Sequence, residues 1–248
     1  MKKTLKRILL GICILVVIII LFFVGYMLKA KSEIKKMSPV ETKEIVDNIF
    51  SIRDSFSNLY LVKDSDQYIV FDAGNDPDIV SGELTKLGIS PEKISAVFLT
   101  HSDGDHVRAI KLFGNAKIYL SVNEEQMING ETPRFLFFGN KIDTKEYLLI
   151  ADRQVVNIGN IQIEGILTPG HTPGSMCYLV NDKYLFTGDL LSIKDGLIGK
   201  NSKIFNMDTK TSVKSIDNIT HLPDCEYIFS AHYGFTNDYN NAIKDWIK

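Results

Sequence analysis

An uncharged apolar run of 21 residues constrains the fold of this chain more than any other feature of its sequence. It extends from Ile8 to Leu28, reads ILLGICILVVIIILFFVGYML and contains no proline. About 20 apolar residues are needed for a helix to cross the hydrocarbon core of a membrane, and a helix packed in a protein core normally shows a polar face. A secretory signal has a shorter apolar region, although cleavage around Ala30 and Ser32 stays open. We therefore expect an uncleaved transmembrane anchor over residues 8–28.

The anchor divides the chain into four expected parts. A basic tail covers residues 1–7, the transmembrane anchor covers 8–28, a charged juxtamembrane linker covers 29–44, and one globular domain covers 45–248. The two flanks of the anchor carry four basic residues each, so the positive-inside rule gives little preference for either orientation. Because a short basic tail is typical of a signal anchor, we expect a single-pass membrane protein with an extracytoplasmic domain. The lipid bilayer is then a partner through residues 8–28.

Charge is distributed unevenly along the chain. The first 36 residues contain eight basic residues and one acid, Glu33. Of the 28 basic and 30 acidic residues in the whole chain, 20 and 29 remain in the rest, which carries about −9 at neutral pH. Phosphate backbones bind to basic surfaces. We therefore expect no nucleic-acid partner.

Short apolar runs alternate with helical patterns through the globular part. The predicted strands cover residues 59–63, 68–72, 94–100, 116–120, 154–158, 161–167, 175–180, 183–186 and 226–230, and the predicted helices cover 79–87, 107–113, 210–221 and 237–247. This order favours two sheets packed face to face with helices outside them. The aromatic run of residues 135–138 is expected in the core, and Cys177 and Cys225 are expected as buried free thiols.

The segment HSDGDH, which follows a predicted buried strand, carries the strongest chemical pattern. It places His101, Asp103, Asp105 and His106 within six residues. Imidazole nitrogens and carboxylate oxygens are natural ligands for zinc, iron and manganese, and two uncompensated carboxylates would be costly to bury. An exposed polar loop is the alternative interpretation of this segment taken alone.

Three further motifs add weight to the metal interpretation. TPGHTPGS places His171 in a stiff turn between two predicted strands, TGD places Asp189 after a strand, and AHYG places His232 after another. Each motif is weak by itself because a lone histidine is usually structural. His221 belongs to no motif and is expected at a surface or a helix end.

Together with FDAG at residues 71–74, these motifs resemble the metallo-β-lactamase superfamily in sequence and in order, over residues 50–235. The segment SNLYL at residues 57–61 is similar to the glyoxalase II-type hydrolases of that superfamily. The resemblance implies an α/β fold, a four-layer αββα sandwich, which here follows one N-terminal transmembrane helix. It also implies a site for two metal ions in a groove at one edge of the sheets.

The resemblance implies a role for eight residues of this chain. The first metal would bind to His101, Asp103 and His171, the second to Asp105, His106 and His232, with Asp189 bridging the two and Asp72 holding the metal loop in place.

Asp103 is the departure from the family pattern with the largest chemical consequence, because the usual loop is HxHxDH and has a histidine there. Arg108 and Ala109 also stand in place of the usual glycines, and Ala231 and Tyr233 flank His232. Asp103 gives the site a third carboxylate, which shifts metal preference toward harder ions. We expect two divalent ions, with zinc favoured and iron or manganese allowed by Asp103.

The activity that the resemblance implies is metal-dependent hydrolysis of a small-molecule substrate, in which a metal-bridged hydroxide attacks an ester, thioester, lactone or amide carbonyl. Asp105 would orient the nucleophile or shuttle its proton, and Tyr233 would contact substrate or simply pack. Specificity is expected in loops 126–145 and 192–206. Two alternatives remain: a di-iron redox enzyme, and a non-catalytic metal-binding sensor module.

Overall fold

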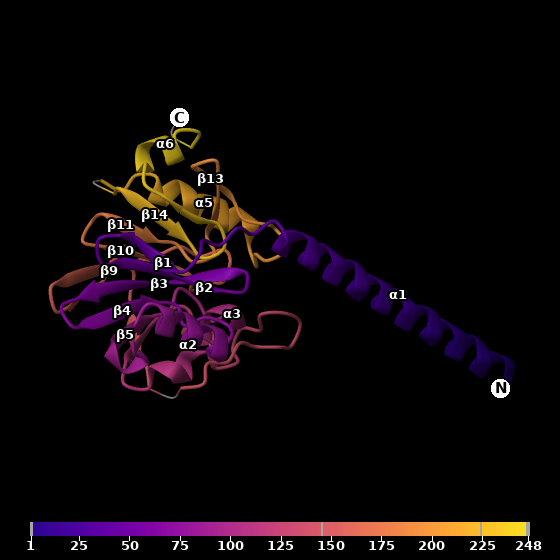
Figure 1. Ribbon diagram of the computed structural model, residues 1–248. Helices are drawn as coiled ribbons and strands as arrows, with labels where there is room; N and C mark the ends of the chain where they lie inside the picture. The colour runs from indigo at the N-terminus through magenta and orange to yellow at the C-terminus, as the bar shows by residue number, and fades with distance from the viewer. Residues whose placement is uncertain (1, 145, 224, 247–248) are drawn as a thin grey trace. The chain divides into compact units, whose positions relative to one another are not determined.

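The computed structural model describes residues 2–144, 146–223 and 225–246 (Figure 1). Helix α1 (Lys2–Ile34) belongs to an N-terminal unit, and residues from Ser38 onward form a separate compact unit. Within α1, residues Thr4–Ile34 are long and apolar enough to cross a membrane, and the most apolar 18-residue window has a mean hydropathy of 3.5 and no buried residue.

Helix α1 continues beyond the expected anchor. Residues 29–34, which we expected in a linker, are helical up to Ile34. The side chains of Lys29 and Glu33, one helical turn apart, form an ion pair of 2.5 Å, and pairs at this spacing stabilise helices. The first strand of the larger unit begins at Lys43, slightly before the expected start of the globular domain.

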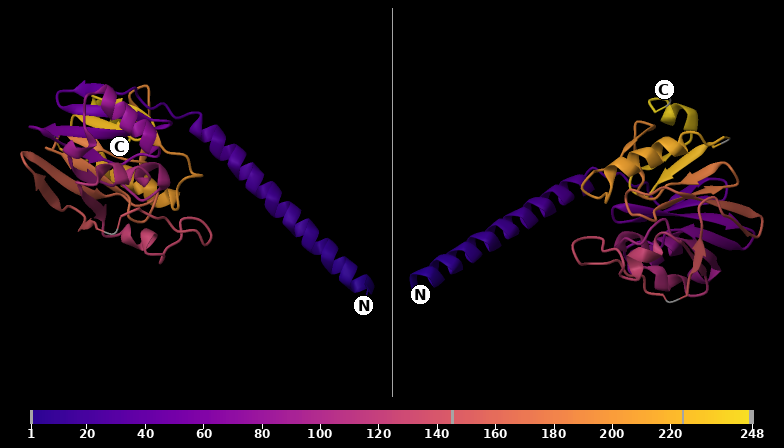
Figure 2. Two further views of the ribbon diagram at one scale, coloured as in Figure 1. Left: turned by 60° about the horizontal axis from the view of Figure 1, so that its bottom comes forward. Right: turned by 180° about the vertical axis from the view of Figure 1, so that it is seen from behind.

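Two mixed sheets form the centre of the larger unit (Figures 1 and 2). In the described residues the first sheet has seven strands in chain order: β1 (Lys43–Val46), β2 (Ile49–Asp54), β3 (Ser57–Asp64), β4 (Gln67–Phe71), β5 (Ile94–Phe98), β6 (Lys117–Ser121) and β7 (Leu148–Ile150). Strands β1 to β4 pair antiparallel and β4 to β7 pair parallel. Parallel neighbours need a crossover connection, and the segments that follow β4 and β5 supply the helical elements on one face of this sheet.

The second sheet has the strand order β15-β14-β11-β10-β9-β8. Its strands are β8 (Val155–Ile158), β9 (Ile161–Leu167), β10 (Met176–Val180), β11 (Tyr184–Phe186), β14 (Tyr227–Ser230) and β15 (Gly234–Thr236). Strands β11 and β14 are parallel, and the other neighbours are antiparallel. A separate hairpin of β12 (Leu191–Lys194) and β13 (Leu197–Lys200) follows β11.

Three apolar clusters lie between the four layers of this unit, which are the two sheets and the helices on their outer faces. On β3, Tyr60 and Val62 belong to the cluster between the sheets, whereas Leu59 and Leu61 belong to the cluster beneath the helices that cover the first sheet. This alternation follows from the two-residue period of a strand. The helical elements are α2 (Pro77–Lys86), η1 (Pro91–Lys93), α3 (Gly104–Val107), η2 (Ile110–Phe113), α4 (Glu125–Ile128), α5 (Thr209–Ile219) and α6 (Tyr239–Ile243).

The third cluster contains Cys177 and Leu179 of β10 together with Ile216 of α5 and Ile243 of α6. Helices α5 and α6 therefore cover the second sheet, and the predicted αββα sandwich is confirmed. Burial raises the pKa of the Cys177 thiol to about 12, and Cys177 and Cys225 are both free and buried, as expected.

Residues Phe135, Leu136, Phe137 and Phe138 are 39%, 62%, 78% and 61% exposed, so their expected place in the core is wrong. They form a tight turn in which the backbone N–H groups of Phe135 and Phe138 donate to each other's carbonyl oxygens. Leu136 has a positive φ of 53° at its tip. Side chains on so short a turn cannot reach the core, whatever their hydrophobicity.

Three other predicted elements differ in extent. The helix expected over 107–113 is divided into α3 and η2, and the loop expected over 192–206 contains most of the β12–β13 hairpin. The closing helix is the short α6, and Ile247 lies outside the described residues.

Candidate metal centre

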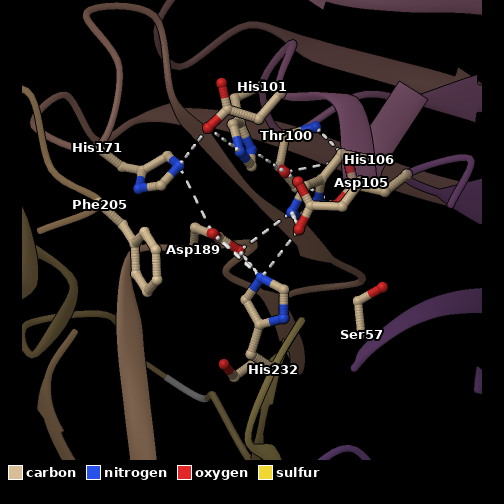
Figure 3. Close-up of polar contacts among 12 residues, drawn as sticks. Ser57, Thr100, His101, Asp105, His106, His171, Asp189, Phe205 and His232 are labelled. Carbon is tan, nitrogen blue, oxygen red and sulfur yellow. Dashed lines mark hydrogen bonds and ion pairs between the residues drawn. The ribbon is translucent and has the colours of Figure 1, made fainter. Parts of the chain in front are cut away.

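Four loops at the carboxyl ends of strands bring the predicted ligands together (Figure 3). His101, Asp103, Asp105 and His106 follow β5, with the last two on α3, and His171 lies between β9 and β10. Asp189 follows β11, and His232 connects β14 to β15. Both sheets thus contribute to one site, which is why Asp105 and His232, 127 positions apart in the sequence, become neighbours.

Asp189 lies at the centre of this group (Figure 3). Its Oδ1 is 3.2 Å from His106 Nε2 and 3.0 Å from His232 Nε2, and its Oδ2 is 3.5 Å from His171 Nε2. The Asp189 side chain is 8% exposed. One buried carboxylate therefore contacts imidazoles from three separate loops, which is the position expected of a bridging ligand.

The remaining side chains form two sets on either side of Asp189. In one set, Asp103 Oδ2 is 2.9 Å from His171 Nε2 and 3.6 Å from His101 Nε2. In the other, Asp105 Oδ2 is 3.6 Å from His106 Nε2 and 3.5 Å from His232 Nε2. Within each set the potential ligand atoms lie within 4.8 Å of one another, close enough to surround one ion.

Hydrogen bonds to the outward-facing Nδ1 atoms orient two of the imidazoles. Asp72 Oδ2 accepts a hydrogen bond of 2.8 Å from His106 Nδ1, and the backbone carbonyl of Phe56 accepts one of 3.0 Å from His232 Nδ1. A proton on each Nδ1 leaves the Nε2 lone pair directed into the site. Asp72 also accepts from the backbone N–H of Thr100 at 2.8 Å. Its positive φ of 65° is uncommon for a residue other than glycine, and such outliers cluster at functional sites.

The donor set fits a divalent cation. His101 Nε2, His106 Nε2 and Asp189 Oδ1 are buried without a hydrogen-bond partner among the described residues, although buried polar atoms are nearly always satisfied. Burial opposes a positive charge on His106, but the carboxylates of Asp72, Asp189 and Asp105 outweigh it and hold the pKa of His106 well above its ordinary value. This concentration of negative charge is what a cation would neutralise in place of protons.

Glu124 is a functional candidate that sequence reasoning missed. It is fully buried at the start of α4, three residues after the end of β6. Its Oε1 accepts hydrogen bonds from the backbone N–H and the hydroxyl of Ser102, at 2.8 and 2.6 Å. Its Oε2 accepts from the Thr172 hydroxyl at 2.6 Å and the Gly174 N–H at 3.1 Å. Glu124 therefore joins the loop of His101 and Asp103 to the loop of His171.

Gly174 is required for this junction. A Cβ atom at Gly174 would lie 2.0 Å from the backbone nitrogen of Glu124, so only glycine lets the two chains approach so closely. The available sequence signal was a pair of adjacent acids after a predicted strand, which no spacing rule connects to a glycine 50 residues further along the chain.

Arg134 and Asn140 were also missed, although both lie in the loop expected to set specificity. Asn140 Nδ2 donates to Asp103 Oδ1 at 2.8 Å and to the Ser102 hydroxyl at 2.9 Å, and Arg134 forms an ion pair with Asp103. Tyr233, by contrast, is half-buried and packs against the cluster beneath α5 and α6. A substrate contact by Tyr233 stays a prediction.

His221 lies outside the group, as expected. It is exposed after α5, and its Nδ1 is 2.9 Å from the Asp217 carbonyl oxygen. We expect His221→Ala to leave metal content and activity unchanged and to alter the free energy of unfolding by less than about 0.5 kcal/mol, as is usual at the surface. Metal analysis and thermal unfolding of this variant beside the unmodified chain check the assignment, and a loss of bound metal would show that a ligand has been misplaced.

The fold and the site together define a metal-binding αββα protein. The sequence pattern of the metallo-beta-lactamase superfamily matches residues 52–232, so the chain belongs to this superfamily, and it is a metallo-hydrolase, as its named relatives are.

Those relatives match much of the chain. A probable metallo-hydrolase of Bacillus subtilis is 29% identical over 71% of this chain and 84% of its own length. A probable polyketide biosynthesis zinc-dependent hydrolase of the same species is 32% identical over 52% of this chain, which spans about half (53%) of that relative. Among solved structures, MEM-A1, a subclass B3 metallo-beta-lactamase from a soil metagenome library, is similar with a TM-score of 0.62 and 21% identity, over 79% of this chain and 80% of the other.

Proposed function

We propose that this metallo-hydrolase uses two divalent ions, most favourably zinc, to hydrolyse an ester, thioester, lactone or amide at its carbonyl carbon. We also propose that α1 holds the protein at a membrane. The observation that carries the proposal is Asp189, whose buried carboxylate contacts His106, His171 and His232 between two sets of ligand atoms. A relative named as a zinc-dependent hydrolase supports the choice of zinc, and the exposed apolar surface of α1 supports the membrane anchor.

His101, Asp103 and His171 would hold one ion, Asp105, His106 and His232 the other, and Asp189 would contact both. When bound, such ions supply Lewis acidity toward a carbonyl oxygen and lower the pKa of water. The chain's own residues set the geometry. Asp72 and the Phe56 carbonyl fix His106 and His232 with Nε2 facing inward.

Asp105 is the residue best placed to move a proton. Its side chain is 23% exposed, whereas that of Asp189 is 8% exposed. A carboxylate that borders both solvent and the site can orient water on one side and pass a proton outward on the other. Asp105 is the catalytic residue of the proposal for this reason.

The charge balance of the site favours hydrolysis over di-iron redox chemistry. Three carboxylates would favour hard, redox-active metals, but the guanidinium of Arg134 pairs with Asp103 and offsets the additional negative charge. The relatives named as hydrolases favour catalysis over a metal-binding sensor without activity.

The test is a panel of activated esters, thioesters, lactones and β-lactams, given to the full chain in detergent. We expect hydrolysis of at least one class, its loss after chelation and its return with zinc. Asp105→Asn should lower kcat by about 10²–10⁴-fold, the usual contribution of general acid–base catalysis. The matched control is Asp66→Asn in the exposed β3–β4 turn, which should retain full activity. A metal-loaded chain that hydrolyses nothing in the panel would contradict the proposal.

A further inference from the structure

The Asp103 carboxylate is already occupied by a cationic side chain. Arg134 Nε donates to Asp103 Oδ1 at 2.8 Å and to Oδ2 at 3.0 Å, and Arg134 Nη2 donates to Oδ2 at 2.8 Å. The side chains of Arg134 and Asp103 are only 21% and 16% exposed. A forked guanidinium–carboxylate pair of this kind is among the strongest side-chain interactions, particularly when water is largely excluded.

The same guanidinium also borders another ligand atom of the first set. Arg134 Nη2 is 3.4 Å from His171 Nε2 and donates to the Phe205 carbonyl at 2.7 Å. Asp103 Oδ2 and His171 Nε2 are themselves 2.9 Å apart. An ion bound to these two atoms would therefore compete with Arg134 Nη2 for both of them.

The second set is arranged differently. Asp105 pairs with the imidazoles of His106 and His232, and Asp189 pairs with the same two imidazoles and with His171. Neutral imidazoles can turn a lone pair toward an ion, whereas a guanidinium stays charged at every accessible pH and repels one. The first ion position therefore borders a permanent cation, whereas these contacts of the second position are with imidazoles and carboxylates.

We propose that Arg134 makes the two metal positions unequal. The position formed by Asp105, His106, Asp189 and His232 fills first, at low free metal. The position formed by His101, Asp103 and His171 fills only when Arg134 releases Asp103, so the chain holds one ion over a wide range of metal concentration. This inference rests on the proposed metal centre, but it does not depend on which bond is hydrolysed.

The turn that carries Arg134 makes this release a local event. The Arg134 N–H donates to the Phe138 carbonyl at 2.8 Å, and Asn140 holds Asp103 from the other end of the same turn. The side chains between them are exposed, so little packing resists a movement of the turn. Arg134 is a positioning residue in this scheme, because it acts through Asp103.

The experiment measures bound zinc in the full chain at buffered free-zinc concentrations, by equilibrium dialysis with elemental analysis after chelator stripping. For the unmodified chain we expect two separated steps of one ion each. Arg134→Gln should leave the first step in place and move the second to at least tenfold lower free zinc. Arg134→Lys keeps the charge but loses the fork, and should give a smaller shift. Arg153→Gln, which breaks an exposed pair with Glu164, is the matched control and should change neither step.

Loading of both ions in one step by the unmodified chain would overturn the proposal, as would an Arg134→Gln curve identical to that of the Arg153→Gln control. Thermal unfolding of each variant shows that it is folded. Asp103→Asn is a second test variant, because it removes the carboxylate that Arg134 and the second ion share. It should abolish the second loading step and leave the first step unchanged. If zinc loads in two steps but no carbonyl substrate is hydrolysed, the proposed function is wrong and this inference still holds.

Discussion

Replacing Asp189 with alanine is expected to abolish hydrolysis and to lower the zinc content of the purified chain below one ion. Loss of a residue that merely orients a ligand typically costs about 10- to 100-fold in metal affinity or activity. Asp189 contacts His106, His171 and His232 directly, so its loss should exceed about 100-fold on both measures. Elemental analysis and initial rates on the best substrate of the panel measure the two effects.

Asp66→Ala is the control for this variant, because it removes the same side chain from an exposed turn. It should retain both zinc and activity. Normal zinc content in folded Asp189→Ala would show that the carboxylate is not a ligand, and normal activity would exclude it from the reaction.

The second large effect concerns stability. We expect Glu124→Gln to lower the free energy of unfolding by about 2–4 kcal/mol, because the amide nitrogen of glutamine must face donors that now reach a carboxylate oxygen, either those of Ser102 or those of Thr172 and Gly174. Each buried donor left without an acceptor costs about 1–3 kcal/mol. For a chain of this size the loss corresponds to a fall in Tm of roughly 5–12 °C.

Glu125→Gln makes the same change one residue away and is the control. Glu125 is half-buried, and among the described hydrogen bonds its side chain accepts only from the Tyr147 hydroxyl, at 3.0 Å, an acceptor that glutamine retains. Its Tm should stay within about 2 °C of the unmodified chain. Equal melting of the two variants would show that Glu124 does not hold the metal loops together.

Strands with a clear apolar pattern were predictable from sequence. Strand β9 was predicted with its observed bounds, Ile161–Leu167, and β10 is buried along its whole length, so a continuous apolar run identified it. The β12–β13 hairpin was not predicted, because each of its strands has only four residues and is partly exposed. The aromatic run at 135–138 misled the analysis because hydrophobicity indicates burial only when the backbone can reach the core.

The seven predicted ligand positions lie at strand ends, in motifs with glycine or paired acids, and the fold brings all seven together. Glu124 and Arg134 were missed because neither belongs to a recognised motif and each has partners 22 or more positions away. The residue type at position 103 was an indirect sign of a cationic neighbour such as Arg134. A carboxylate in place of a histidine adds negative charge to a buried site, and such a charge needs a cationic partner.

Anomalous X-ray scattering at the zinc edge, from crystals of zinc-loaded protein, tests the metal centre most directly. The account predicts a strong peak bounded by Asp105, His106, Asp189 and His232, and at high zinc a weaker second peak bounded by His101, Asp103 and His171. Zinc absent from both positions in a crystal of active protein, or bound only at some other part of the surface, would contradict it.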